Sequence, residues 1–179
     1  MAAVCVFLSS SDGLPAHHAA VRELAAELVR RDLTLVYGGA HRGLMGVLAD
    51  SVLAGRGRAI GVIPRALVDL EIAHRGLTEL HVVDTMHQRK QGMFDRADAF
   101  VVGPGGFGTL EEAFEHLTGM QLGYHAKPIV FLDPDEFWQP LAVFLDHATR
   151  TGVLRAEVRG LFRTAATPSE ALDALAMRA

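Results

Sequence analysis

The chain has 179 residues, of which 50% are hydrophobic, a formal net charge of −4 and one cysteine. This length suits one domain with a full core, and the apolar content argues against a disordered chain. The acidic balance argues against a broad nucleic-acid surface, and no apolar run reaches the roughly 18 residues that a membrane helix needs.

Short β-rich runs alternate with helical patterns along the chain. The predicted strands lie at 3–8, 33–38, 58–63, 79–83, 98–102, 127–132 and 160–165. Apolar residues at helical spacing after Pro15 predict a helix over 16–31. We therefore expect a Rossmann-like doubly wound parallel sheet of about seven strands with helices on both faces, in a single domain over residues 1–179.

The first run, "AVCVFL", is predicted to be a strand and not a signal peptide, because no basic segment precedes it and no cleavage site follows it. Its Cys5 can form no internal disulfide. We therefore expect a cytoplasmic protein.

Two glycine loops follow predicted strands, at the edge of the sheet where such folds bind ligands. They are "YGGAHRGLMG" (37–46), in which Arg42 is a candidate anion contact, and "GPGGFGT" (103–109). The second loop leads into a helix predicted to begin near Thr109. Bare backbone at a helix N-terminus favours a phosphate. A tight turn without a ligand is the alternative.

The second loop also has the spacing G-x-G-x-x-G, and Asp133 follows about 25 residues later, as in a dinucleotide fingerprint. An NAD(P)-binding oxidoreductase is therefore an alternative function. Two features argue against it: the loop follows the fifth strand and not the first, and the glutamates after Thr109 would crowd a pyrophosphate. Asp133 is expected to start the next helix.

Three glutamates, Glu111, Glu112 and Glu115, occupy the first two turns of the helix predicted over 110–122. They suit the helix dipole, and Thr109 with Glu112 matches a capping box. The buried stripe is expected to be Leu110, Ala113, Phe114 and Leu117. Alternatively, clustered carboxylates beside a phosphate could stabilise positive charge on a sugar, which is the chemistry of glycosidic cleavage.

A second charged motif, "DTMHQRKQGMFDRAD" (84–98), precedes the fifth strand. Arg89 and Lys90 are expected on a helix, either as a solvated pair or as contacts to a phosphate or to the leaving base. The nine histidines have no metal-ligand spacing, and only His87 is expected near the site. Ser9, at the end of the first strand, either binds the nucleotide or caps the next turn.

The segment "PGGFGTLEE" (104–112) resembles the P-G-G-x-G-T-x-x-E signature of the LONELY GUY (LOG) family, the cytokinin riboside 5′-monophosphate phosphoribohydrolases. "LVYGGAHRGLMG", "GVIPRAL" and "MHQRKQGM" resemble further segments of that family, and the likeness covers roughly residues 4–150. This chain departs from the residues usual in that family at Leu8, Ala40 and Gly103. The first two lie in the loops that would enclose the nucleotide and therefore affect the expected substrate preference.

The resemblance implies hydrolysis of the N-glycosidic bond of N6-modified AMP, or of AMP, to free base and ribose 5-phosphate. It also implies no redox cofactor and a homodimer with sites near the interface, and the histidine spacing gives no metal site. Arg89 and Glu112 would be the catalytic pair. The candidate nucleotide contacts are Lys90, Gly105, Gly106, Phe107, Gly108, Thr109, Glu111, Glu115, Thr118, Glu71, Ser9, Gly39 and Arg42.

A rival function is a non-catalytic carrier that holds a phosphorylated cofactor such as molybdenum cofactor with the same loops, since a fold alone does not fix a function. Relatives of the family are also described as lysine decarboxylases. A pyridoxal phosphate enzyme needs a Schiff-base lysine. The only lysines, Lys90 and Lys127, lie in the R-K motif and at a strand start, where neither suits that role.

Overall fold

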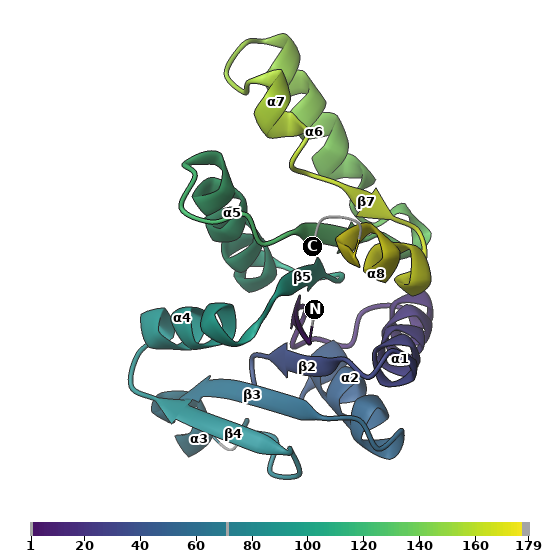
Figure 1. The fold of residues 1–179 in the computed structure, drawn as a ribbon, viewed down its shortest axis with the longest axis vertical. Coiled ribbons are helices and arrows are strands. Elements are labelled where there is room, and N and C mark those ends of the chain that lie inside the picture. The colour runs from purple at the N-terminus through teal and green to yellow at the C-terminus, as the bar shows by residue number, and fades with distance from the viewer. Residues whose placement is uncertain (1, 71, 177–179) are drawn as a thin grey trace.

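The computed structural model describes residues 2–70 and 72–176, and within them seven strands form one sheet (Figure 1). The strand order is β4-β3-β2-β1-β5-β6-β7, and every neighbouring pair is parallel. The strands are β1 (Ala3–Phe7), β2 (Thr34–Tyr37), β3 (Ala59–Pro64), β4 (Glu79–Val83), β5 (Ala99–Val102), β6 (Ile129–Leu132) and β7 (Thr164–Ala165). The predicted doubly wound sheet is confirmed, with a last strand of only two residues.

Helices connect these strands and cover both faces of the sheet (Figure 1). They are α1 (Pro15–Arg30), α2 (Gly43–Ala54), α3 (Arg65–Asp69), α4 (Met86–Arg96), α5 (Phe107–Gln121), the 3-10 helix η1 (Pro134–Glu136), α6 (Gln139–Arg150), α7 (Ala156–Arg159) and α8 (Pro168–Ala176). Asp133 Oδ1 accepts a hydrogen bond from Trp138 N at 2.5 Å, so Asp133 starts this helical segment as expected. None of the helices in the described residues is both long and apolar enough to cross a bilayer.

The strands are apolar at nearly every position because helices cover both faces. In β1, Val4 and Val6 pack into a core shared with α1, α2 and α8. The intervening Cys5 and Phe7 pack into a second core with residues of α4, α5 and α6. Successive side chains of a strand point to opposite faces, so a strand between two helical layers lacks apolar–polar alternation.

The strand order changes direction between β1 and β5, which is where doubly wound sheets bind ligands. The loops that follow these two strands touch each other, because Ser9 N donates to Pro104 O at 3.0 Å. The start of α2 rests on the same loop, where Leu44 N donates to Ser11 O and Met45 N to Ser9 O. Both glycine loops therefore lie beside the end of β1.

Helix α5 begins two residues earlier than predicted, with Gly106 as its N-cap. Thr109 therefore lies inside the first turn, and the predicted Thr109–Glu112 capping box is wrong. The Glu112 carboxylate is instead bonded to Arg89. The buried face differs as well, because Glu112 and His116 are buried while Leu110 and Phe114 are only partly buried.

Candidate active site

Arg89 from α4 and Glu112 from α5 form a buried ion pair, with Arg89 Nη1 3.1 Å from Glu112 Oε1. The residues are only 7% and 6% exposed, respectively. A charged pair this deep in a protein needs further hydrogen bonds to offset the loss of hydration. In this structure the further hydrogen bonds are made by Arg89.

Backbone carbonyls of β3 and of the residue that follows β2 hold the rest of the Arg89 guanidinium. Nε donates to Val62 O at 3.3 Å, and Nη2 donates to Gly38 O at 3.4 Å. The cation is therefore fixed between the sheet and Glu112. Its donors in this structure face the protein and not an open cavity.

Gly38 has a specific role in this arrangement, because a Cβ at that position would lie 1.8 Å from Arg89 Nη2. We expect Gly38→Ala to displace the guanidinium and to lower the free energy of unfolding by about 1–3 kcal/mol, as overpacking does. Urea unfolding measures this change. In an Arg89→Ala background the added methyl group meets no guanidinium, so a comparable loss there would contradict this explanation.

Burial raises the pKa of Glu112 to about 7, against the opposing effect of Arg89, and the neighbouring Glu111 raises it slightly further. A carboxyl group with this pKa exchanges its proton near neutral pH. Such a shift is typical of groups that take part in chemistry.

The raised pKa makes stability depend on pH. Glu112 binds its proton more tightly in the folded chain than in the unfolded chain, so its contribution to folding falls as the pH rises from 4.5 towards 7. This shift corresponds to about 3 kcal/mol. We expect Glu112→Gln to gain stability over the wild type by about this amount across that range, measured by urea unfolding at each pH. A difference that stays constant with pH would contradict the raised pKa.

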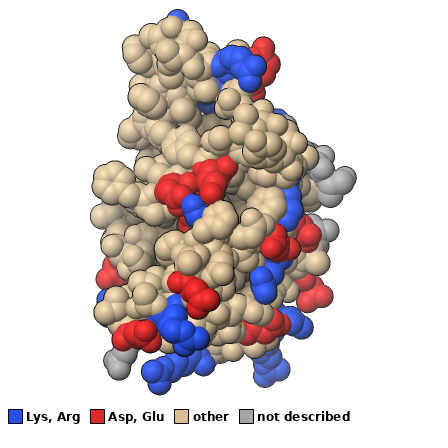
Figure 2. Space-filling model, turned by 90° about the vertical axis from the view of Figure 1, so that its left-hand side faces the viewer, with Lys and Arg blue, Asp and Glu red and all other residues tan. Residues whose placement is uncertain are grey.

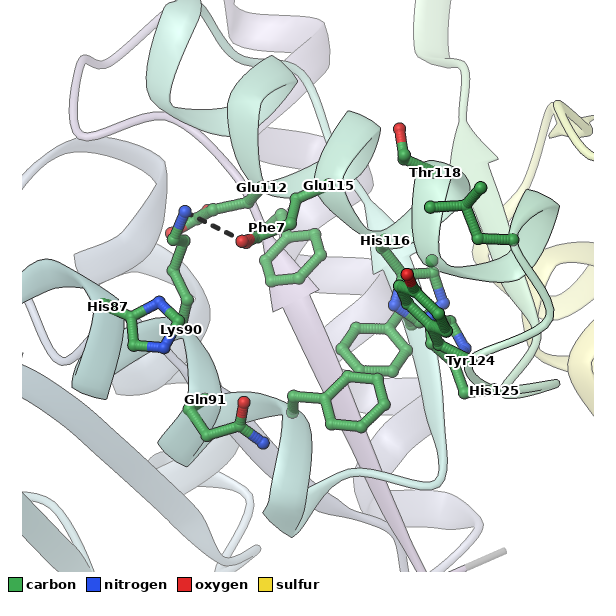
Figure 3. Close-up of a pocket in the computed structure, with 14 residues that line it drawn as sticks. Phe7, His87, Lys90, Gln91, Glu112, Glu115, His116, Thr118, Tyr124 and His125 are labelled. Carbon is green, nitrogen blue, oxygen red and sulfur yellow. Dashed lines mark ion pairs between the residues drawn. The ribbon is translucent and has the colours of Figure 1, made fainter.

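Lys90 is held between the two other glutamates of α5. Its Nζ lies 2.5 Å from Glu111 Oε1 and 3.0 Å from Glu115 Oε2. The hydrogen bond to Glu111 is the main reason that the pKa of Lys90 is raised. Acidic side chains surround a basic one near the middle of the face in Figure 2, above further charged side chains, and the close-up shows the pair of Lys90 with Glu115 (Figure 3). The structure thus brings the two predicted charged motifs together.

Gly103 N donates to Phe7 O at 2.8 Å, but the backbone amides of residues 105–109 make no hydrogen bond to a backbone acceptor. The first intrahelical bond of α5 runs from Leu110 N to Gly106 O, so the amides of the preceding turn lack helical acceptors. A Cβ added at Gly106 or Gly108 would meet nothing within 4 Å, and Phe107 is 93% exposed. Gly105 is required for packing, because its Cβ would lie 2.1 Å from Thr109 Oγ1.

A pocket of about 480 Å³, here named the α4–α5 pocket, opens beside the ion pair (Figure 3). Glu112, Lys90, Glu115 and Thr118 contribute to its wall, together with His87, as predicted for that histidine. The remaining wall is largely aromatic and includes Phe94, Phe100, Tyr124, His116 and His125. A cavity with one charged wall and one aromatic wall suits a ligand that is ionic at one end and flat and apolar at the other.

Residues 45–175 match the family described as "possible lysine decarboxylase". The chain is 43% identical over 173 residues to the probable cytokinin riboside 5′-monophosphate phosphoribohydrolase LOGL2 of Oryza sativa, covering 96% of this chain and 71% of that protein. It is 44% identical over 158 residues to the cytokinin riboside 5′-monophosphate phosphoribohydrolase of Rhodococcoides fascians, covering 87% and 80% of the two chains. The chain belongs to the LOG family.

The fold of this LOG family member also occurs in a molybdenum cofactor binding protein from Rippkaea orientalis. The TM-score is 0.75, with 98% of this chain and 96% of that chain covered, at 16% identity. At that identity the likeness concerns the fold alone.

Of four further predicted contacts of the LOG family, the three in the described residues lie away from the α4–α5 pocket or are already engaged. Ser9 Oγ accepts a hydrogen bond from Ser11 N at 2.9 Å, so Ser9 caps the turn after β1. Gly39 is buried, has φ +76° and accepts a hydrogen bond from His74 N. Arg42 is the exposed N-cap of α2. Glu71 lies outside the described residues.

Three residues of the site were missed in the sequence. Gly38 belongs to a recognised glycine loop, but its contact with Arg89 spans 51 positions. His116 and His125 were treated as scattered histidines, although both line the pocket. His116 lies four residues after Glu112 on the same helix, and this spacing is the signal that would have indicated its inward position.

Proposed function

We propose that this LOG family protein is a phosphoribohydrolase that cleaves the N-glycosidic bond of nucleoside 5′-monophosphates of the adenine type, N6-modified or unmodified, to free base and ribose 5-phosphate. The observation that carries the proposal is the buried Arg89–Glu112 pair between an open helix N-terminus and an aromatic pocket. Relatives named cytokinin riboside 5′-monophosphate phosphoribohydrolases at 40–45% identity support the substrate class.

In this reading the loop of residues 105–109 binds the 5′-phosphate through its backbone amides and the helix dipole. The ribose then lies beside Glu112, and the base extends into the α4–α5 pocket. Departure of the base leaves positive charge on the ribose, which the ionised Glu112 stabilises. The same carboxylate orients and activates the water that completes the hydrolysis.

Arg89 acts mainly by holding Glu112. All three of its nitrogens contact protein groups, and this favours a positioning role over direct contact with the departing base. Its charge opposes the rise in the pKa of Glu112, and so increases the fraction of Glu112 that is ionised at neutral pH. Lys90, Glu111, Glu115 and Thr118 surround the space in which the ribose would lie.

The rival functions lack such support from the geometry. A carrier of a phosphorylated cofactor needs an anion loop but not a buried carboxylate whose pKa is raised to about 7. For a lysine decarboxylase, both lysines of the chain are engaged: Lys90 by two glutamates, and Lys127 by Phe94 O at 2.7 Å and Ala97 O at 2.8 Å. An NAD(P) enzyme would show micromolar binding of NAD(P)H by fluorescence titration, and we expect none.

The direct test is a product assay. The protein is incubated with AMP, with N6-isopentenyl-AMP and with the corresponding nucleosides, and free base is separated by chromatography. We expect base from the monophosphates and far less from the nucleosides, because the nucleosides lack the group that the loop binds. Absence of base from every monophosphate would refute the proposal.

We also propose a homodimer with the site close to the interface. Exposed apolar side chains lie on α6 and on the turns that follow α5 and α6, and exposed apolar surface commonly marks interfaces. They are Leu122, Tyr124, Val143, Phe144 and Val153. Sedimentation equilibrium measures the mass in solution, and a monomer at micromolar concentration would refute this part of the proposal.

The proposed location is the cytoplasm. Cys5 is free and completely buried, which is compatible with a reducing compartment. Cell fractionation followed by detection of the protein tests this assignment, and recovery outside the cytoplasm would overturn it.

A further inference from the structure

Lys127, two positions before β6, holds the C-terminal end of α4. Its Nζ donates to Phe94 O at 2.7 Å and to Ala97 O at 2.8 Å, and it lies 4.0 Å from the centroid of the Phe94 ring. The last carbonyls of a helix lack partners within that helix and carry partial negative charge, so an ammonium group there is stabilising. The same ammonium group attracts the face of the Phe94 ring, which lines the α4–α5 pocket.

The backbone of Lys127 holds α5. Nε2 of His116 lies 2.9 Å from Lys127 O, which can only accept, so the imidazole donates this hydrogen bond. Burial lowers the pKa of His116 to about 4, so the ring is neutral at pH 7 and keeps its proton on Nε2. His116 also lines the pocket, and Figure 3 shows it on the side away from Lys90. One residue therefore holds a pocket wall from each of the two helices.

The two helices meet differently at the two ends of the α4–α5 pocket. The ion pairs described above join them at the charged end. At the aromatic end, Phe94 from α4 and His116 from α5 have ring centroids 6.0 Å apart. Phe100 and His125 pack against both rings, but aromatic packing tolerates shifts that a directed hydrogen bond does not. The hydrogen bonds of Lys127 therefore fix the spacing of the helices at this end.

We infer that Lys127 is a positioning residue that sets the width of the aromatic end of the α4–α5 pocket, where the base of the nucleotide binds. The inference rests on the proposed function, in which the base occupies that end and the 5′-phosphate binds the loop of residues 105–109. Lys127 is not part of the pocket wall and acts through Phe94 and His116. Its loss should therefore weaken binding of the base and spare binding of ribose 5-phosphate.

The first test is Lys127→Met, which removes the ammonium group but keeps much of the side-chain length and the backbone carbonyl. We expect KM for AMP to rise about tenfold, because the wall that contacts the base loses two hydrogen bonds. The values of kcat and of Ki for ribose 5-phosphate should stay within about twofold of the wild type, because Glu112 and the loop are untouched. Steady-state release of base, with ribose 5-phosphate as product inhibitor, measures all three.

A purely stabilising role of Lys127 predicts a different result, since a folded variant would then keep the wild-type KM. An unchanged KM in folded Lys127→Met would overturn the inference. A KM and a Ki that rise together would also overturn it, because the site would then be distorted as a whole and not at its aromatic end.

Two further variants test the specificity of the effect. Lys127→Arg keeps a cation with donors for both carbonyls and should restore most of the wild-type KM. The matched control is Arg159→Met on α7, away from the pocket (Figure 1). Arg159 likewise donates to a carbonyl, Phe162 O at 3.2 Å, and lies 5.3 Å from the Phe162 ring centroid. Its loss should leave KM unchanged, and a rise equal to that in Lys127→Met would contradict the inference.

The outcomes separate this inference from the proposed function. Release of base by the wild type with the same KM in Lys127→Met would refute the role of Lys127 and leave the phosphoribohydrolase intact. No release from any monophosphate by the wild type would refute both. Thermal unfolding shows whether Lys127→Met folds. If it does not, Lys127→Gln decides, because its amide can donate to one carbonyl and should give the same split between KM and Ki at smaller size.

Discussion

Glu112→Gln is expected to lower kcat/KM for adenine-type nucleoside 5′-monophosphates by about 10²–10⁴-fold. The exchange keeps the shape of the side chain and its place beside Arg89, but removes the negative charge that faces the developing cation on the ribose. The loss corresponds to about 3–5 kcal/mol of barrier. Steady-state release of free base from AMP and N6-isopentenyl-AMP measures it.

The pH profile provides a second readout of the same residue. Because the pKa of Glu112 is about 7, the wild-type kcat/KM should fall as the pH drops below 7 and the carboxylate becomes protonated. The residual kcat/KM of Glu112→Gln should not show this fall below pH 7. Glu23→Gln, the same exchange at an exposed position of α1, serves as the control and should behave like the wild type. A glutamine variant within threefold of the wild type would refute the role of Glu112.

Arg89→Met is expected to reduce activity by at least about 100-fold and also to destabilise the chain. Methionine fills much of the same space but leaves the Glu112 carboxylate buried without its cation. Breaking a buried pair by removal of one partner costs about 3–5 kcal/mol. The remaining carboxyl can avoid this cost by keeping its proton, so the destabilisation should be smaller at pH 5 than at pH 8.

Urea unfolding at both pH values, combined with the double variant Arg89→Met/Glu112→Gln, distinguishes the charge effect from simple loss of packing. Without the carboxylate, the arginine exchange should cost much less stability at pH 8, while activity stays low. Equal destabilisation at the two pH values, or no recovery in the double variant, would show that the pair is not electrostatically coupled as the structure indicates.

The fold was largely predictable because helices cover both faces of the sheet, and strands in such a sheet need apolar residues at nearly every position. Continuous apolar runs such as 98–102 indicated strands covered on both sides, and alternation with helices indicated a parallel sheet. The exact start of α5 was not predictable, since Gly106 and Gly108 permit several backbone conformations. The helix begins at Phe107, and this places Thr109 inside the first turn and leaves Glu112 free to face Arg89.

The sequence by itself determined the two glycine loops, the clustering of Arg89 and Lys90, and the acidic start of α5, because these features depend on neighbours along the chain. Only the tertiary structure decided which glutamate faces inward, that Gly38 makes room for the guanidinium, and that His116 and His125 share a pocket with Glu112. The physical reason is that burial, and with it the pKa of Glu112, arises from contacts between segments 23 to 51 positions apart. Helical periodicity cannot specify such contacts, since it does not show which face of a helix meets which neighbour.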